Sequence, residues 1–314
     1  MKPLMIGSFA LIASFCANAF DPIWKEVNVL HNENKIILAG DSCELLNKEG
    51  VALSTWSKKL NELDITESSC VCEKGYCKKD VTTLVPKFVK NNYDRRMYVI
   101  GPNSFNTALQ VSKITSQFRY ASGTEMNFWM NSKLCHEKST HEPLESGDLA
   151  LIRSWKNGDL FGYVHITENL AFSKNSYLPV NSYYLQSPIA LLDKLEVPQN
   201  CRKTGGTPKE CPIWVNHFSC QTFDAYLKTH PITSDQAKKS YAQFVDIEKQ
   251  VGNAVEKNAW NDPTVRSALI DTLVELNNLA FEIIKSKKFH EKDKIIWQAI
   301  FHMTKSINGQ LDHI

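Results

Sequence analysis

The sequence carries almost no net charge, and this absence narrows the classes of partner that it can bind. Its 36 basic and 34 acidic residues leave a formal charge of +2, and the two signs are well mixed along the chain. No basic block is present, so nothing in the sequence favours a nucleic-acid-binding protein. Repeats and low-complexity tracts are also absent, so we expect no repeat architecture.

Long hydrophobic runs are scarce as well. The one extended run lies in residues 1–19, where residues 4–15 are mostly apolar and Ala17-Asn18-Ala19 fits the small-x-small rule for signal cleavage. It is too short for a membrane span. Cys16 would suggest a lipoprotein, but the preceding Phe15 is bulky for a lipidation site. We expect a cleaved signal peptide and export to the periplasm or the extracellular space, without a transmembrane span.

Eight cysteines remain after signal cleavage, and an even number in an exported chain indicates disulfide bonds. They are Cys43, Cys70, Cys72, Cys77, Cys135, Cys201, Cys211 and Cys220. We expect Cys201 and Cys211 to close a local loop, and the three cysteines at 70–77 to pair among themselves or with Cys43. The C-x-C-x4-C run also offers three thiols to a metal, but no second pair follows at zinc-site spacing. We therefore expect disulfides and neither a metal ion nor a cofactor.

Composition and hydrophobic pattern divide the chain into four segments. They are the signal peptide at 1–19, a cysteine-containing segment at 20–97, an α+β domain at 98–230 and a helical extension at 231–314. In the second segment we expect a strand at 36–40, a helix at 49–63 and a disulfide-held surface loop at 68–80.

The third segment changes its hydrophobic period along its length. Apolar residues at helical spacing predict helices at 103–117 and 124–135. Strands are then predicted at 149–153, 160–167, 170–174 and 183–185, followed by a loop at 197–222. A pair of helices followed by an antiparallel meander is typical of the α+β class.

The fourth segment contains three long helical patterns, at 234–257, 263–288 and 291–311. Each has an apolar stripe of the kind that forms the core of a helical bundle. None of them contains a cofactor signature.

The stretch YVIGPNSFNTAL at 98–109 places a hydroxyl at the start of a helix. An apolar run stops at Gly101-Pro102, and the helical pattern begins at Asn103 or Ser104. The positive partial charge and free N–H groups of a helix N-terminus suit a nucleophile. They suit a helix cap equally well, because serine and asparagine are preferred caps. The stretch alone leaves both interpretations open.

Three motifs follow one another along the chain: GPNSFNTAL at 101–109, LESGDLALI at 144–152 and GYVHITENLAFSKNS at 162–176. Their order and spacing resemble the NlpC-like branch of papain-like cysteine peptidases and amidases, over roughly residues 98–176. The resemblance implies a papain-like fold with a nucleophile-position helix and an antiparallel sheet. It also implies a substrate class, the stem peptides of bacterial cell walls.

The catalytic residues of that family are replaced in this chain. Ser104 stands where the family has its cysteine, and gapless counting places Phe161 near the position of the family's histidine. A serine hydroxyl needs a strong base, and Phe161 accepts no proton, so we expect an inactive or much weakened site. His165 shares a strand face with Phe161 and Tyr163, so a small register shift would make it the base. Cys135 is a weaker alternative nucleophile.

Three functional hypotheses follow. The favoured one is a catalytically degenerate binding protein whose groove holds a cell-wall peptide or an envelope partner protein. Its binding residues would be Asn103, Phe105, Trp129, Asp148, Phe161 and Tyr163, with Phe128 and Trp155 adding aromatic surface. The second is an active cell-wall peptide hydrolase that uses Ser104 and His165. The third is a structural envelope protein that works through its C-terminal helices.

Overall fold

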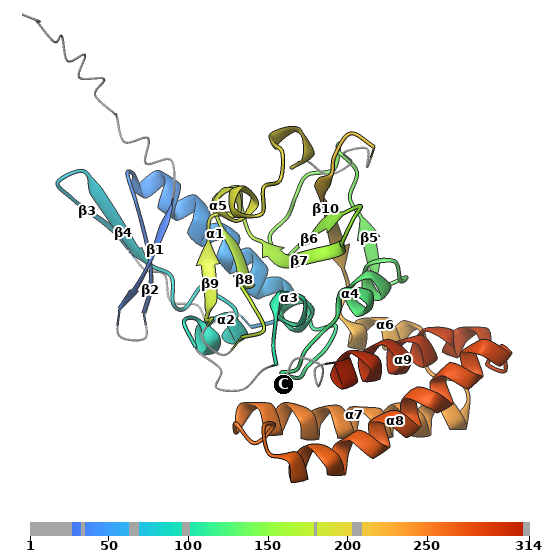
Figure 1. Cartoon of the computed structure of the whole chain (residues 1–314). Coiled ribbons are helices and arrows are strands. Elements are labelled where there is room, and N and C mark those ends of the chain that lie inside the picture. The colour runs from blue at the N-terminus through green and yellow to red at the C-terminus, as the bar shows by residue number, and fades with distance from the viewer. Residues whose placement is uncertain are drawn as a thin grey trace, which may run out of the picture.

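The described part of the molecule contains two antiparallel sheets and a set of helices (Figure 1), which confirms the predicted α+β class. The computed structural model describes residues 27–32, 35–62, 69–95, 101–178, 181–202 and 209–309. The expected signal peptide at 1–19 and the apolar run at 98–100 lie outside these ranges.

The N-terminal segment forms a four-stranded sheet with a helix packed against it. Its described strands are β1 (Asn28–Asn32), β2 (Lys35–Gly40), β3 (Cys70–Glu73) and β4 (Tyr76–Asp80), in the spatial order β1-β2-β4-β3. Helix α1 (Cys43–Lys59) begins after Ser42, whose hydroxyl accepts a hydrogen bond from the Leu45 backbone N–H at 3.3 Å. Helix α2 (Lys87–Asn92) follows the sheet.

The predicted surface loop at 68–80 contains a hairpin, β3–β4. Its turn residues Lys74 and Gly75 have φ angles of 52° and 79°, the positive values that a two-residue hairpin turn requires. Cys72 and Cys77 face each other across the two strands. The prediction missed these strands because charged residues and cysteines interrupt the apolar alternation that marks a strand.

A six-stranded antiparallel sheet is the centre of the described molecule. Its strands are β5 (Cys135–Glu137), β6 (Leu149–Ser154), β7 (Gly158–His165), β8 (Ala171–Lys174), β9 (Tyr183–Gln186) and β10 (Ile213–Cys220), in the order β5-β10-β6-β7-β8-β9. The consecutive strands β6 to β9 confirm the predicted meander.

Strand β10 was missed, because it lies in the predicted loop at 197–222. It pairs with β5 on one side and β6 on the other, so it is an internal strand. Its polar residues Asn216 and His217 are buried. Asn216 accepts a hydrogen bond from Trp214 Nε1 at 2.7 Å and donates one to the Glu137 carboxylate. The hydrogen-bond partners of these polar residues are present only in the folded sheet. In the sequence, the same residues are typical of a loop.

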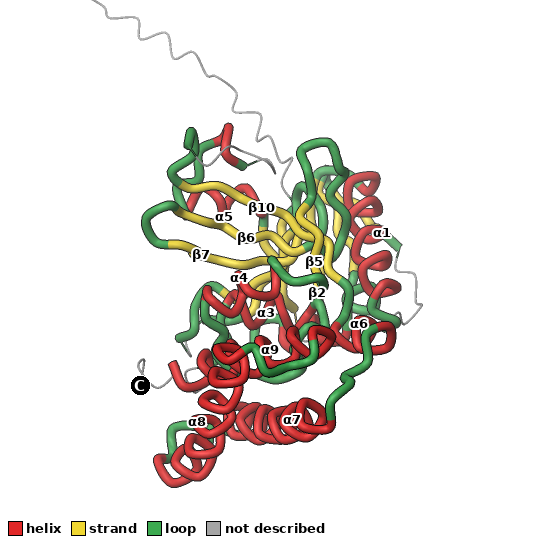
Figure 2. The backbone as a smooth tube through the Cα atoms, turned by 90° about the vertical axis from the view of Figure 1, so that its right-hand side faces the viewer, coloured by secondary structure: helices red, strands yellow, loops and turns green. Residues whose placement is uncertain are grey.

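The two faces of the central sheet support different layers (Figure 2). One face packs against α3 (Ser104–Val111) and α4 (Gly123–Met130), through residues that include Leu149, Leu151 and Val164. The opposite face packs against α5 (Pro188–Lys194) and the short 3₁₀ helix η1 (Gln199–Cys201), through residues that include Ala150, Ile152, Phe161 and Tyr163. Strand alternation therefore decides which layer each side chain meets.

Helices α3 and α4 are both shorter than predicted. α3 ends at Val111, and Lys113 just beyond it has a φ of 54°, a left-handed conformation that does not continue a helix. α4 ends at Met130, where Asn131 is the C-cap residue. Apolar residues beyond these ends, such as Ile114 and Leu134, are buried although they are not helical.

Helix α6 (Phe223–Thr229) lies at the end of the predicted α+β domain, where no helix was predicted. The described part of the C-terminal segment consists of helices, as predicted. They are α7 (Asp235–Glu256), α8 (Pro263–Ser286), the 3₁₀ helix η2 (Glu291–Asp293) and α9 (Lys294–Gly309). No helix of the described ranges combines the length and apolar character that crossing a membrane requires. One cluster of buried side chains extends from Val27 to Ile307, so the three expected segments share a core.

Four disulfides join the eight cysteines of the described chain: Cys43–Cys70, Cys72–Cys77, Cys135–Cys220 and Cys201–Cys211. The expected local pair Cys201–Cys211 is confirmed. The bond between Cys135 of β5 and Cys220 of β10 removes Cys135 as a nucleophile, so that alternative is wrong.

The fully buried Arg119 connects the central layer to the C-terminal helices. Its guanidinium donates to both carboxylate oxygens of Glu125 on α4, at 2.7 and 2.8 Å, and to Glu248 on α7 at 2.7 Å. Trp129 Nε1 donates to Glu125 at 3.3 Å. Burial raises the pKa of Glu248, and the neighbouring guanidinium opposes that rise. The two buried carboxylates therefore depend on Arg119 for their main compensating charge.

Replacing Arg119 should destabilise the whole fold. Arg119→Met keeps much of the side-chain volume but leaves two buried carboxylates without their cation, so we expect the free energy of unfolding to fall by about 3–5 kcal/mol. Urea denaturation followed by circular dichroism measures this loss.

Lys238→Ala is the control, because Lys238 forms an exposed ion pair with Asp235 at 3.2 Å. We expect this variant to lose less than about 1 kcal/mol. Equal losses in the two variants would contradict the role assigned to Arg119.

Candidate functional site

Ser104 is the first residue of α3 and is buried. Asn103, the residue before it, caps the helix, because its side-chain oxygen accepts a hydrogen bond from the Asn106 N–H at 3.0 Å. The Asn103 amide also donates to the Ala121 carbonyl at 2.7 Å. Ser104 is thus free of the capping role, and its Oγ accepts a hydrogen bond from the backbone N–H of Gly162 at 3.3 Å.

The residue of β7 that meets Ser104 is Gly162, one position beyond the Phe161 that gapless counting predicted. Strand alternation turns Phe161 toward the α5 layer instead. A Cβ atom on Gly162 would lie 3.2 Å from Phe105 Cδ1 and 3.6 Å from the Ser104 carbonyl oxygen. The strand therefore presents a glycine, without a side chain, beside Ser104.

His165 does not meet Ser104. It lies on the same face of β7 as Tyr163, which belongs to the α5-facing cluster, whereas α3 packs on the other face. Its ring centroid is 5.8 Å from that of His217, and the two rings are nearly perpendicular. The strand alternation that makes His165 a neighbour of Phe161 separates it from Ser104.

The two histidines are uncharged near neutral pH. Burial lowers the pKa of His165 to about 4, against the opposing charges of Asp148 and Glu168. Burial, together with His165 and Lys138, lowers the pKa of His217 to about 3. An uncharged, enclosed imidazole pair far from the serine fits a structural role.

Asp148, predicted to be a binding residue, orders the turn before β6. One of its carboxylate oxygens accepts a hydrogen bond from the Glu145 N–H at 2.7 Å and lies 2.9 Å from Lys138 Nζ. Both charged side chains are buried. Asp148 is therefore engaged within the fold and is not available to a ligand.

All six predicted binding residues are buried. They are Asn103, Phe105, Trp129, Asp148, Phe161 and Tyr163, and none is more than 7% exposed. Trp129 packs its ring 5.2 Å from that of Phe223. Of the other predicted aromatics, Trp155 is 62% exposed, next to Trp214 at 5.3 Å between ring centroids. The six predicted binding side chains therefore belong to the core of the described residues.

Lys174 is more deeply buried than its place at a strand end suggests. Its ammonium group donates to the carbonyl oxygens of Ser176 and Leu178. Burial lowers the pKa of Lys174 to about 8. These hydrogen bonds tie Lys174 to the segment that follows β8, so its ammonium group serves the fold.

A cavity of about 500 Å³ lies between α4, α6 and η2–α9. Its lining includes Thr124, Asn127, Phe128 and Asn131, which share one face of α4, and Ile295, Gln298 and His302, which share one face of α9. Tyr226 and His230 close it from the end of α6. Among the aromatics predicted to form a binding surface, Phe128 is the one that lines the cavity.

Two stacked aromatic–imidazole pairs stand in the wall of this cavity. The rings of Phe128 and His302 are 4.7 Å apart and nearly parallel, and those of Tyr226 and His230 are 4.3 Å apart. Burial lowers the pKa of His302, so this imidazole adds no charge at neutral pH. The pairs offer flat apolar surface to a ligand.

Positive charge surrounds the mouth of the cavity. Lys133, Lys292 and Lys294 line it together with a single carboxylate, Glu291. Glu291 is 3.6 Å from Lys294. Within the described ranges neither Lys133 nor Lys292 has an ion-pair partner. A cavity of this size with apolar walls and free cations suits a small anionic ligand.

No family model, curated protein or solved structure matches this chain. The geometry of Ser104 and of the cavity is therefore the basis for assigning a function.

The buried histidines should make stability fall on mild acidification. The folded-state pKa values of about 4 and 3 lie below the ordinary value near 6.5, so the unfolded chain binds protons first as the pH falls. We expect the free energy of unfolding to decrease from about pH 6.5 toward pH 4, by up to about 1.4 kcal/mol per pH unit for each histidine.

Urea denaturation from pH 7.5 to 4.5 measures this slope. His165→Gln or His217→Gln should flatten it, while the exposed His141→Gln should leave it unchanged. A slope that is the same in all three variants would mean that other groups cause the acid sensitivity.

Proposed function

We propose that this is an exported, non-catalytic binding protein with a degenerate NlpC-like fold, and that its cavity binds an acidic group of a cell-wall stem peptide. The papain-like fold, the export and the ligand class come from the sequence and its resemblance. The arrangement of α3 against the antiparallel sheet fits that resemblance.

The surroundings of Ser104 carry the non-catalytic part of the proposal. Its hydroxyl is buried, accepts a hydrogen bond from the Gly162 N–H, and faces a glycine on β7. A serine nucleophile must pass its proton to a positioned base. His165, the base considered from the sequence, lies on the other face of the sheet, so the hydrolase hypothesis has no observation in its favour.

The lining of the cavity supports the ligand class. Lys133 and Lys292 can pair with a carboxylate, and the amides of Asn131 and Gln298 can hydrogen-bond a peptide backbone. The stacked pair of Phe128 and His302 offers a flat wall to an aliphatic side chain. Peptides with free carboxylates, such as stem peptides, match this combination of charge, amides and apolar surface.

Removing the two lysines should weaken binding. In isothermal titration with stem-peptide fragments, we expect the Lys133→Ala/Lys292→Ala variant to bind about tenfold more weakly, a loss of about 1.4 kcal/mol. Because these cations are exposed, raising the salt concentration should also weaken binding to the wild type.

The matched control is Lys239→Ala/Lys249→Ala, which removes two exposed lysines of α7 that do not line the cavity. This variant should bind as tightly as the wild type. Equal weakening in both double variants would mean that the net charge of the protein, and not the cavity, determines binding. Titrations that show no binding with any fragment would exclude the stem peptide as ligand.

Incubation with purified peptidoglycan separates binding from hydrolysis. We expect no released fragments from the wild-type protein. Fragments that appear with the wild type and disappear with Ser104→Ala would overturn the non-catalytic part of the proposal.

A further inference from the structure

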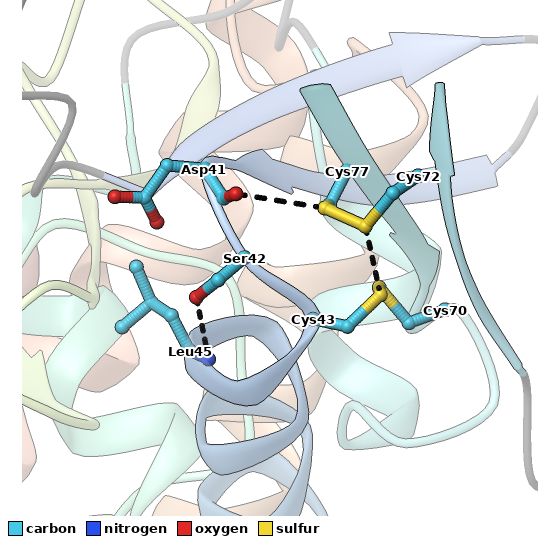
Figure 3. Close-up of a disulfide and its surroundings, with 7 residues drawn as sticks. All are labelled: Asp41, Ser42, Cys43, Leu45, Cys70, Cys72 and Cys77. Atoms are coloured by element: carbon cyan, nitrogen blue, oxygen red, sulfur yellow. Dashed lines mark hydrogen bonds between the residues drawn. A yellow bond between two sulfur atoms is a disulfide. The ribbon is translucent and has the colours of Figure 1, made fainter. Parts of the chain in front are cut away.

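Two disulfides of the N-terminal sheet lie in contact with each other (Figure 3). Cys43 Sγ of one bond is 3.3 Å from Cys72 Sγ of the other. We propose that reduction of Cys43–Cys70 and Cys72–Cys77 turns this sulfur cluster into a Zn²⁺ site formed by all four cysteines. This proposal is independent of the cavity and its ligand.

The fold brings the four cysteines together from three elements, β3, β4 and α1. Cys70 and Cys72 are two residues apart on β3, so they share one face of the hairpin, and Cys77 faces Cys72 across it on β4. Cys43 is the first residue of α1. Three thiols thus stand on a two-stranded ribbon and the fourth approaches from a helix start, an arrangement that can surround a metal ion.

The distances suit tetrahedral zinc. A Zn–S bond of about 2.3 Å places the sulfur atoms of a tetrahedral site about 3.8 Å apart. The sulfur atoms of Cys43, Cys70 and Cys72 all lie within 4.8 Å of one another, and Cys77 Sγ is bonded to Cys72. Cys77 Sγ lies outside this group of three, so four Zn–S bonds require the Cys77 side chain to rotate toward the other three once its disulfide is reduced.

The surroundings of the cluster favour the thiolates that zinc needs. Cys43 lies in the first turn of the 17-residue helix α1, where free N–H groups and the helix dipole stabilise negative charge. Cys72 is exposed, whereas Cys77 is only 2% exposed. An external thiol can therefore reach Cys72, and the reduced cluster remains partly sheltered.

The Cys72–Cys77 bond closes a short loop, so it constrains the unfolded chain less than a bond between distant cysteines does. Its two cysteines are 5 residues apart, against a separation of 85 residues in Cys135–Cys220. The turn of Lys74 and Gly75 already brings the strands of this hairpin together. Losing this bond is compatible with a folded hairpin.

The reaction balances with an external dithiol as reductant. Two dithiol molecules reduce the two protein disulfides to four thiols and are themselves oxidised to two disulfides. Zn²⁺ then binds the four cysteines as thiolates and releases four protons. In the reverse exchange, two external disulfide molecules oxidise the four cysteines to two protein disulfides, are reduced to two dithiols, and Zn²⁺ is released. The cluster would thus alternate between a disulfide form and a zinc form.

The remaining four cysteines form no comparable cluster. Across the described ranges, the cluster at Cys43, Cys70 and Cys72 is the only group of three or more metal-ligating side chains close enough to share an ion. Cys135–Cys220 and Cys201–Cys211 are separate bonds without a third sulfur at that distance. They can be reduced without creating a four-thiol site.

Zinc binding to the full-length protein tests the proposal. The oxidised protein is reduced with dithiothreitol, freed of reductant without oxygen, and mixed with Zn²⁺ alone. Native mass spectrometry should show one tightly held Zn²⁺ in the reduced protein and none in the oxidised protein. Co²⁺ in place of Zn²⁺ should give the intense sulfur-to-metal absorption of a tetrathiolate site.

The variants decide which cysteines hold the metal. Cys72→Ser/Cys77→Ser should lose the bound Zn²⁺, whereas Cys201→Ser/Cys211→Ser should retain it. Zinc retained by the first variant, or absent from the reduced wild type, would overturn the proposal. Circular dichroism follows folding, and reduction that unfolds the protein without recovery on adding Zn²⁺ would also overturn it.

Discussion

The pairing of Arg119 with Glu125 and Glu248 is the constraint on which the arrangement of layers depends. A buried guanidinium without carboxylates, or buried carboxylates without the guanidinium, would be strongly unfavourable, so the three groups are stable only together. Glu125 belongs to α4, which packs on the central sheet, and Glu248 belongs to α7 in the C-terminal helices. The network therefore requires the helices to dock on the sheet layer in one way.

The start of α3 packs closely against strand β7 of the central sheet. Phe105, directly after Ser104, is buried against the sheet, and its ring lies where a side chain at position 162 would have to go. Ser104 is thereby held against the strand backbone by the Gly162 N–H. Glycine at 162 therefore permits the close approach of α3 to β7.

The sequence predicts the elements better than it predicts their pairing. Strong helical periodicity identified α7, α8 and α9, because each buries one continuous apolar stripe. Alternation identified the meander of β6 to β9, but β10 escaped because its buried Asn216 and His217 resemble loop residues until Glu137 and the neighbouring strands are in place. At the site, gapless counting from the motifs pointed to Phe161, whereas the strand residue beside Ser104 is Gly162. Successive side chains of a strand point to opposite faces, so a difference of one residue changes the face. Phe161 and His165 therefore lie on the face opposite α3.

The cavity could not have been predicted from any one stretch, because its walls come from α4, α6 and α9, which are far apart in the sequence. Helix α4 links it to the rest of the fold. Glu125 and Trp129 lie on the inner side of α4, within the Arg119 network, whereas Asn127, Phe128 and Asn131 line the cavity on another side of the same helix. The network that fixes α4 thus also fixes one wall of the cavity. A binding site placed on a helix held in this way is preorganised, so a ligand would lose little affinity to ordering the protein.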